Sequence, residues 1–284
     1  MQANLVFTPF AKPVPPLGIA SLKSYVEAKS EHKVKCFDLN ALYHNDLIDD
    51  VHYKRGKMNF SEQDRAVFLR AVDTFSNKNG EMFNQAIFDS SANTLFEGCF
   101  DNINKFFNKE LGQAEKGRAA VPWFINKYVN LLLADNPDVI GFSIMLGEQI
   151  SFSLVMAGII KQRNRNIKII FGGNAATMTY KKLLTYSYID YIVLDEGEKA
   201  FLDLLNALDG QKPIGSIKNL AYRDGQMLIE SERELIKDLN ELPIPDFSDF
   251  DLYSYFIPEP VVSVLGTRGC FWRRCAFCTH YKSY

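Results

Sequence analysis

The chain has 284 residues, of which 47% are hydrophobic and 23% are charged, and its formal net charge is −2. This length predicts one or two domains with a buried core, and the near-neutral charge excludes binding to nucleic acid or an anionic membrane through overall charge. No apolar run is long enough for a membrane-spanning helix, and the N-terminus lacks the basic segment of a signal peptide. Five cysteines, three of them clustered, favour a reducing compartment such as the cytoplasm over a disulfide framework.

The chain begins with the pattern of a β–α–β unit. Residues 5–8 form a short apolar run, and residues 34–39 form a second one. Between them, Pro16 stands where a first helical position is expected, and apolar residues at helical spacing follow over residues 17–29. This pattern predicts two parallel strands joined by a right-handed crossover.

Residues 41–136 do not continue the alternation of strand and helix, and we interpret them as a helical insertion. Aromatic and aliphatic residues recur there at helical spacing, and residues 61–64 resemble a capping box, so we expect three or four helices. Two interpretations are open: a helical cap with its own small core, or a lid over the ligand-binding edge of the sheet. The aromatic stripes favour the cap.

From residue 138 the alternation of strand and helix returns. Strands are predicted over residues 138–143, 167–171 and 191–194, and helices over residues 149–163, 179–186 and 198–208. Together with the N-terminal unit, they predict an α/β fold over residues 1–210: a doubly wound, five-stranded parallel sheet with the flavodoxin-like order 2-1-3-4-5.

The alternation of strand and helix ends before residues 211–260. Asp224-Gly225 between two apolar runs predicts a β-hairpin, and Pro243 and Pro245 mark a stiff linker. A strand over residues 261–265 then leads into the cysteine cluster. Residues 261–284 are too short to form a core, so we expect them to begin a second domain that the chain does not complete.

Ligands of an open parallel sheet bind beyond the carboxyl ends of its strands. The cofactor-binding candidates at these ends are Thr8, Pro9, Ser143, Gly172, Gly173, Glu196 and Gly197. The alternative is that Ser143 and the glycines only form tight turns. Neither a G-x-G-x-x-G nor a P-loop motif is present, which weakens a dinucleotide or nucleoside triphosphate hypothesis. Glu198 suits the start of a helix for structural reasons, and an acid–base role stays open for Glu196.

Three cysteines in the spacing C-x4-C-x2-C are the metal-ligand candidates: Cys270, Cys275 and Cys278. Thiolates this close on one loop suit a 4Fe–4S cluster with one open iron. A zinc site that includes His280 is the weaker alternative, because its spacing from Cys278 is unusual. The segment also has basic residues and no acidic one, which would offset the charge of the thiolates; they are Arg268, Arg273, Arg274 and Lys282.

With these residues in view, the chain resembles the cobalamin-binding-domain radical SAM proteins. The motifs that carry the resemblance are Arg268-Gly269-Cys270 through Cys278, Pro15-Pro16-Leu17-Gly18, Phe37-Asp38-Leu39-Asn40, residues 137–143, Gly172-Gly173 and Glu196-Gly197-Glu198. They cover both ends of the chain but not residues 41–136, and the first cysteine gap is one residue longer than the usual C-x3-C. A weaker resemblance, to the radical SAM enzymes that mature ribosomally made peptides, rests on residues 145–154 with Gln149, on Gly172-Gly173-Asn174 and on residues 242–249.

The resemblance implies a 4Fe–4S cluster on the three cysteines, with S-adenosylmethionine on its open iron and Phe277 packed near the adenine. Residues 261–284 would then be the first strand and cluster loop of an incomplete radical SAM (β/α) barrel, and the chain alone would show little turnover. It further implies radical modification or methylation of a peptide or small molecule, with an external one-electron reductant and no membrane or nucleic-acid partner. Whether cobalamin takes part is open, because the D-x-H-x-x-G motif that supplies an axial histidine in many cobalamin proteins does not occur. The alternative from another class is a non-catalytic, cobalamin-type small-molecule binding module with a metal-binding tail.

Overall fold

One mixed sheet organises the computed structural model, which describes residues 1–11, 14–52, 62, 63, 65, 66, 69, 90–255, 259–270, 272 and 274–277. Its strands occur in the order β2-β1-β3-β4-β5-β6-β7. The first five are parallel, and β6 and β7 are antiparallel additions at one edge. The strand bounds are β1 Gln2–Phe7, β2 Lys33–Asp38, β3 Val139–Ser143, β4 Lys168–Gly172, β5 Tyr191–Val193, β6 Leu220–Asp224 and β7 Met227–Glu230. The predicted doubly wound parallel sheet and its order are therefore confirmed.

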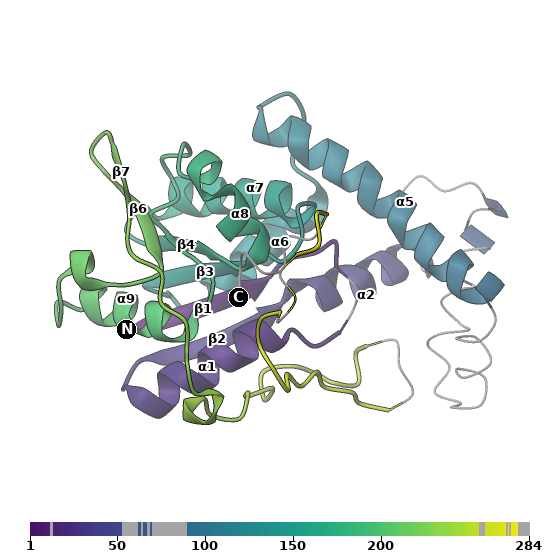
Figure 1. Cartoon of the computed structure of the whole chain (residues 1–284). Coiled ribbons are helices and arrows are strands. Elements are labelled where there is room, and N and C mark those ends of the chain that lie inside the picture. The colour runs from purple at the N-terminus through teal and green to yellow at the C-terminus, as the bar shows by residue number, and fades with distance from the viewer. Residues whose placement is uncertain are drawn as a thin grey trace.

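The central strands are apolar on both faces because helices cover both sides of the sheet. Leu5 of β1 pairs with Cys36 of β2 on one side and with Gly141 of β3 on the other, and residues 3–7 of β1 are all buried. Continuous burial of this kind is typical of strands inside a parallel sheet. One face is covered by α1 (Leu17–Lys29) and α9 (Glu198–Leu208), and the other by α6 (Trp123–Leu133), α7 (Gln149–Arg163) and α8 (Asn174–Leu183) (Figure 1).

The hairpin of β6 and β7 belongs to the sheet, although the sequence placed it in a connecting region outside the five strands. Ile192 of β5 pairs with Ala221 of β6, and both residues are fully buried. The hairpin supplies hydrogen-bond partners to the free edge of β5, which would otherwise present unpaired backbone groups. Two short 3-10 turns, η1 (Ile214–Ser216) and η2 (Leu239–Glu241), flank it in the chain.

The described part of the helical insertion shares the core of the sheet. It comprises α2 (Leu39–His52), the long α5 (Ser90–Glu115) and α6, and α5 extends away from the sheet (Figure 1). Phe107 of α5 and Phe124 of α6 lie in one cluster with Phe152 of α7 and Phe142 of β3. This corrects the expectation of a separate small core, because these aromatic rings are large enough to reach the face of the sheet. Both ends of the predicted capping box, residues 61 and 64, lie outside the described residues.

The segment that contains Pro243 and Pro245, residues 242–255, is docked on the domain rather than acting as a free spacer; we call it the strap. Lys23 of α1, whose side chain is 7% exposed, forms ion pairs with Asp246 at 3.2 Å and Asp249 at 2.9 Å. Asp246 also donates its backbone N–H to the carbonyl of Ala20 at 3.1 Å, and Asp249 accepts the backbone N–H of Cys36 at 2.8 Å. The segment therefore runs along α1 and the outer edge of β2 on its way to the cysteines.

The strand predicted over residues 261–265 is not found. These residues are exposed and have no strand assignment, with Val264 84% exposed. A strand forms only where a neighbouring strand accepts and donates its backbone hydrogen bonds, and the described residues place none beside this segment. Of the described helices, none combines the length and apolarity that are needed to cross a bilayer.

Candidate functional site

The carboxyl ends of the parallel strands meet at one edge, where the chain reverses its winding direction between β1 and β3. In an open α/β sheet this reversal leaves a crevice between the loops, which is where such folds bind ligands. The predicted cofactor residues lie on these loops, after β1, β3, β4 and β5. The structure thus brings them to a common edge, although the side chains differ in what they contact.

Thr8 and Pro9 follow β1 and are buried. The Thr8 hydroxyl lies 3.2 Å from that of Ser153, and its carbonyl accepts a hydrogen bond from the Gln149 amide at 2.6 Å. The Gln149 carbonyl oxygen in turn accepts the backbone N–H groups of Met145 and Leu146 at 2.8 and 2.9 Å. Gln149 therefore ties the loop after β3 to the end of β1, while the role of Thr8 and Pro9 in cofactor binding stays a prediction.

Gly173 has a reason to be glycine that is independent of any ligand. Its backbone has φ 91° and ψ 174°, a region that is essentially restricted to glycine. A Cβ atom there would lie 2.7 Å from the carbonyl oxygen of Ile144. The N–H of Ala175 donates to that same oxygen at 3.0 Å, so Gly173 lets the start of α8 pack against the loop after β3. This contact also explains why α8 begins at Asn174, five residues before the predicted start at residue 179.

Ser143 and Gly197 both lie against α1. Ser143 is half-buried at the tip of β3, and its Oγ lies 3.9 Å from the position that a Cβ of Gly18 would occupy. A Cβ on Gly172 would meet its neighbours only at ordinary van der Waals distances, whereas a Cβ on Gly197 would lie 3.2 Å from Leu22. Ser143 therefore faces the open N-terminus of α1, and Gly197 serves the packing of α9 against α1.

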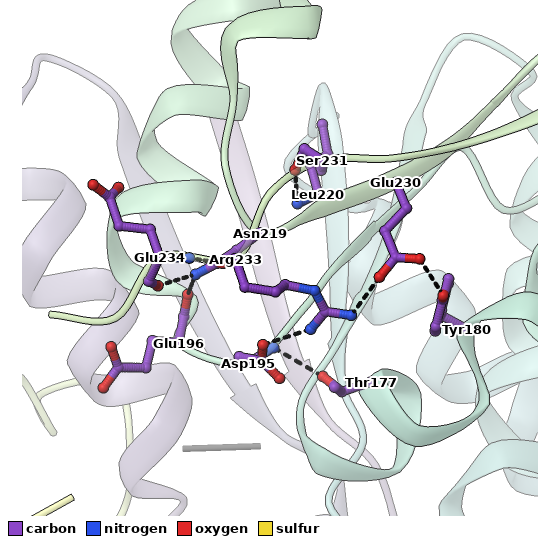
Figure 2. A network of polar contacts seen from close by, with 10 residues as sticks. All are labelled: Thr177, Tyr180, Asp195, Glu196, Asn219, Leu220, Glu230, Ser231, Arg233 and Glu234. Atoms are coloured by element: carbon purple, nitrogen blue, oxygen red, sulfur yellow. Dashed lines mark hydrogen bonds and ion pairs between the residues drawn. The ribbon is translucent and has the colours of Figure 1, made fainter. Parts of the chain in front are cut away.

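A polar network fixes the segment after β5 (Figure 2). Arg233, which follows β7, contacts Asp195 at 2.5 Å and Glu230 at 2.9 Å. Asp195 has φ 56° and donates its backbone N–H to the Thr177 hydroxyl at 3.0 Å. Asn219 donates to the Glu196 carbonyl at 3.2 Å. The hairpin thereby holds the backbone of Asp195 and Glu196 in place at the edge of the sheet.

Glu196 and Glu198 are both buried and both contact Arg268 of the cysteine segment. The guanidinium lies 3.3 Å from a Glu196 oxygen and donates to both Glu198 oxygens, at 3.2 and 2.5 Å. Glu198 is the first residue of α9, as the sequence indicated, but it also has this cationic partner. The structural interpretation of Glu198 thus gains a specific contact, and the same contact engages Glu196.

The cysteine segment itself is exposed. Cys270 and Cys275 are partly exposed, Phe277 is 90% exposed, and Cys278 lies outside the described residues. Within the described part of the chain, no three metal-ligating side chains come together. Two thiols of the predicted triad are thus accessible on one loop, and the donor set has the soft sulfur chemistry that an iron–sulfur cluster requires. The roles of the three cysteines and of Phe277 stay predictions.

Two histidines whose side chains the structure describes, His32 and His44, are engaged in other contacts. His32 precedes β2 at the opposite end of the sheet, where it contacts the N-terminal amine at 3.0 Å and Asn206 at 2.9 Å. His44 is buried inside α2 and contacts the carbonyl of Asn40 at 2.7 Å, and burial lowers its pKa to about 4.

Two oxygens at the ends of β4 and β5 are buried without a hydrogen-bond partner. They are Oδ1 of Asn174, at the start of α8, and Oδ1 of Asp195. A buried acceptor without a donor is unfavourable and calls for an explanation. A ligand that carries amide groups, as the periphery of a corrin ring does, offers suitable donors, so this edge fits cobalamin on the chemistry of its acceptors.

Asp38, at the end of β2, forms a buried pair with Tyr255 of the strap. The tyrosine hydroxyl donates to one carboxylate oxygen at 2.5 Å, and the backbone N–H of Ala41 donates to the other at 3.0 Å. Burial raises the pKa of Asp38 to about 6, and these hydrogen bonds oppose that rise. The pair joins the strap to the same edge of the sheet as the candidate site.

We expect Asp38→Asn to flatten the dependence of stability on pH. Because the Asp38 pKa of about 6 lies above its ordinary value of 3.8, the folded protein binds this proton more tightly than the unfolded chain. The free energy of unfolding therefore falls as the pH rises between these values, by on the order of 3 kcal/mol, and asparagine removes that contribution. Urea unfolding of both proteins near pH 4 and pH 7 measures the difference.

Tyr255→Phe is the matched variant for this experiment. It removes a hydrogen bond that lowers the pKa of Asp38, so the fall in stability should extend to higher pH than in the unaltered protein. An identical pH dependence in the unaltered and Asp38→Asn proteins would contradict the prediction.

Comparison with known proteins bears on the same region. Residues 119–205 match the B12 binding domain. This match runs from just before α6 into α9, so it includes the loops after β3, β4 and β5. The match therefore falls on the part of the edge that holds Ser143, Gly172, Gly173 and Glu196.

Similar proteins are larger than this chain. An uncharacterized methyltransferase, PH0819, of Pyrococcus horikoshii is 29% identical over 147 residues, which is 51% of this chain and 32% of that protein. The anaerobic magnesium-protoporphyrin IX monomethyl ester cyclase of Synechocystis is 29% identical over 114 residues, covering 39% of this chain and 23% of the cyclase. The solved structure of the cobalamin-dependent S-adenosylmethionine radical enzyme OxsB, with aqua-cobalamin and S-adenosylmethionine bound, matches 98% of this chain and 28% of its own, with a TM-score of 0.60 at 17% identity. This chain therefore has the fold of part of that enzyme and spans about a third or less of each of these proteins.

Two elements of the site escaped the sequence analysis. The sequence analysis placed Arg268 in the cysteine motif and among the basic residues of its segment, but it assigned no partner to Arg268 and no role to Arg233. Their partners lie far away in the chain: Glu198 is 70 residues from Arg268, and Asp195 is 38 residues from Arg233. The sequence signal for this site was the acidic pair Glu196 and Glu198 after a predicted strand. Such a pair does not indicate which basic residue will contact it.

Proposed function

We propose that this chain is the cofactor-binding part of a radical SAM enzyme that uses cobalamin. The observation that best supports this proposal is that the same chain contains a match to the B12 binding domain and three clustered cysteines. Arg268 of the cysteine segment forms ion pairs with Glu196 and Glu198, which lie within the matched residues. Cys270, Cys275 and Cys278 would hold a 4Fe–4S cluster, and the loops after β1, β3, β4 and β5 would hold cobalamin. The substrate we propose is a peptide or small molecule, with ribosomally made peptides as the first class to test.

The described residues have definable tasks in this function. When bound, the cluster with S-adenosylmethionine supplies hydrogen-atom abstraction, and cobalamin supplies a methyl group for transfer. The cysteines must lose their thiol protons to ligate iron. Asn174 and Asp195 would accept hydrogen bonds from amide groups of the corrin, and Gln149 would hold the exposed loop with Met145 and Leu146 beside it. A one-electron reductant from outside the chain completes the system.

Anaerobic reconstitution of the chain with iron and sulfide tests the cluster. We expect bound iron and sulfide and a broad absorption in the blue that bleaches with dithionite. Cys270→Ala, Cys275→Ala and Cys278→Ala should each lose it, because three thiolates are needed to hold the cubane. Cys36→Ala is the matched control, since Cys36 is buried between β2 and α1 and should not affect iron binding.

Titration with hydroxocobalamin tests the second cofactor through its absorption spectrum. Binding is expected, without a histidine ligand from a D-x-H-x-x-G motif. Stoichiometric zinc with neither iron nor cobalamin bound would contradict the proposal and favour a non-catalytic module with a metal-binding tail.

A further inference from the structure

Two buried carboxylates lie at the start of α9. The side chain of Glu196 is 4% exposed and that of Glu198 is 7% exposed, and they approach the same cation. Carboxylates with so little solvent are unfavourable unless a positive charge and hydrogen bonds compensate them. The pair therefore needs its partner, and the partner comes from the cysteine segment.

Arg268 meets this need with directional contacts. Its two terminal nitrogens donate to the two oxygens of Glu198 in a bidentate arrangement, and one of them also donates to Glu196. The second oxygen of Glu196 accepts the backbone N–H of Ile236, which holds that carboxylate in place. A bidentate guanidinium–carboxylate contact defines orientation as well as distance. The Arg268 side chain is only 14% exposed, so solvent screens this contact weakly.

The contact lies next to the first cysteine. Arg268 is two residues before Cys270, so their Cα atoms are at most about 7 Å apart. By contrast, neighbouring residues of the segment are open to solvent: Leu265 is 52% exposed and Phe277 is 90% exposed. This contact thus anchors the chain to the sheet two residues before Cys270.

The charges of the site also fit this role. The sequence suggested that Arg268 offsets the negative charge of thiolates and sulfides. In the structure it faces two carboxylates, so its charge is already compensated and is not free to balance a cluster. Arg274 of the same segment is exposed and remains suited to that task.

We propose that Arg268, Glu196 and Glu198 form a joint that docks the cysteine loop on the carboxyl edge of the sheet. The second half of the inference rests on the proposed function: by docking the loop, the joint sets the distance between the cluster and the cobalamin. The three residues are positioning residues, and none of them needs to touch a cofactor.

The first half is tested on the 284-residue chain without cofactors. Backbone ¹⁵N relaxation should give order parameters near about 0.85 for the amides around Arg268, and Arg268→Gln should lower them to below about 0.6. Arg268→Lys should restore them in part, because an ammonium keeps the charge but loses the bidentate geometry. Arg274→Gln, which removes the same charge from an exposed position of the same loop, should leave them unchanged. Order parameters in Arg268→Gln equal to those of the unaltered protein would overturn the joint.

A second variant separates loss of the contact from misfolding of the whole protein. Arg268→Gln leaves two buried carboxylates without a cation, so it is also combined with Glu196→Gln and Glu198→Gln, which removes the uncompensated charges. The triple variant should likewise have a mobile loop while the strands keep their order. A loop that stays ordered in the triple variant would also overturn the joint.

The second half is tested on protein loaded with iron, sulfide and hydroxocobalamin. Pulsed dipolar EPR between cob(II)alamin and the reduced cluster should show a narrow distance distribution that broadens in Arg268→Gln. It should not broaden in Arg223→Gln, which removes an exposed positive charge from β6 instead. If the unaltered protein takes up neither cofactor, the proposed function fails while the relaxation experiment still decides the joint. If it takes up both and the distribution is unchanged in Arg268→Gln, the positioning role is overturned.

Discussion

Gly173→Ala is expected to lower the free energy of unfolding by about 2–6 kcal/mol, the sum of a backbone strain and a steric clash. The backbone of Gly173 has φ 91° and ψ 174°, where a residue with a Cβ is strained by about 1–3 kcal/mol. The added methyl would also lie 2.7 Å from the Ile144 carbonyl oxygen and 3.0 Å from its carbonyl carbon. Because these are backbone atoms, the clash can be relieved only by moving the loop after β3 or the start of α8, which costs about a further 1–3 kcal/mol.

Urea unfolding measures this change, and Gly147→Ala is its matched control. Gly147 lies on the loop after β3, which also carries Ile144. It has an ordinary φ, and a Cβ there would meet nothing within 4 Å. We expect the control to stay within about 0.5 kcal/mol of the unaltered protein. If the two alanine variants were equally stable, the contact between Gly173 and Ile144 would not be as the structure describes it.

Gln149→Leu is expected to cost about 2–4 kcal/mol and to loosen the loop after β3. Gln149 is fully buried, and its amide group makes three hydrogen bonds, to the N–H groups of Met145 and Leu146 and to the carbonyl of Thr8. Leucine has a similar volume but leaves the Thr8 carbonyl buried without a donor, which alone costs about 1–3 kcal/mol. The two freed N–H groups lie on a loop with exposed residues, so water compensates them in part.

Unfolding by urea gives the stability of this variant, and hydrogen exchange at Met145 and Leu146 gives the local effect. Gln162→Leu makes the same substitution at an exposed position of α7 and should be nearly neutral. Equal exchange rates at Met145 and Leu146 in the unaltered and Gln149→Leu proteins would show that Gln149 does not hold the loop. If cobalamin binds as proposed, the same variant should also bind it more weakly, because the loop borders the carboxyl edge.

The joint at Arg268 and the strap at Lys23 suggest how the two parts of the chain are kept together. The strap runs along α1 through the ion pairs of Lys23 and reaches the end of β2 through Tyr255. The joint then holds the cysteine loop at the end of β5. Buried or half-buried ionic contacts and hydrogen bonds thus hold the segment at α1, at the end of β2 and at the start of α9. Such contacts favour one docked orientation over others through their directionality.

Local pattern in the sequence determined the parallel sheet. Apolar runs of strand length alternate with stretches at helical spacing, so five strands and their order could be predicted, and α1 and α7 have the predicted bounds. The cysteine spacing likewise identified a candidate metal loop without any knowledge of the fold. These features depend on residues that are close in the chain, where spacing alone carries the information.

Only the tertiary structure decided the rest, because it depends on residues that are distant in the chain. The hairpin joined the sheet because β5 offered a free edge, and residues 261–265 formed no strand because the described residues place no edge beside them. Gly173 is required by Ile144 of another loop, and Arg268 is paired with glutamates 70 and 72 residues away. A sequence shows that charges and glycines are present, but which of them meet is decided when the core brings the strand ends to one edge.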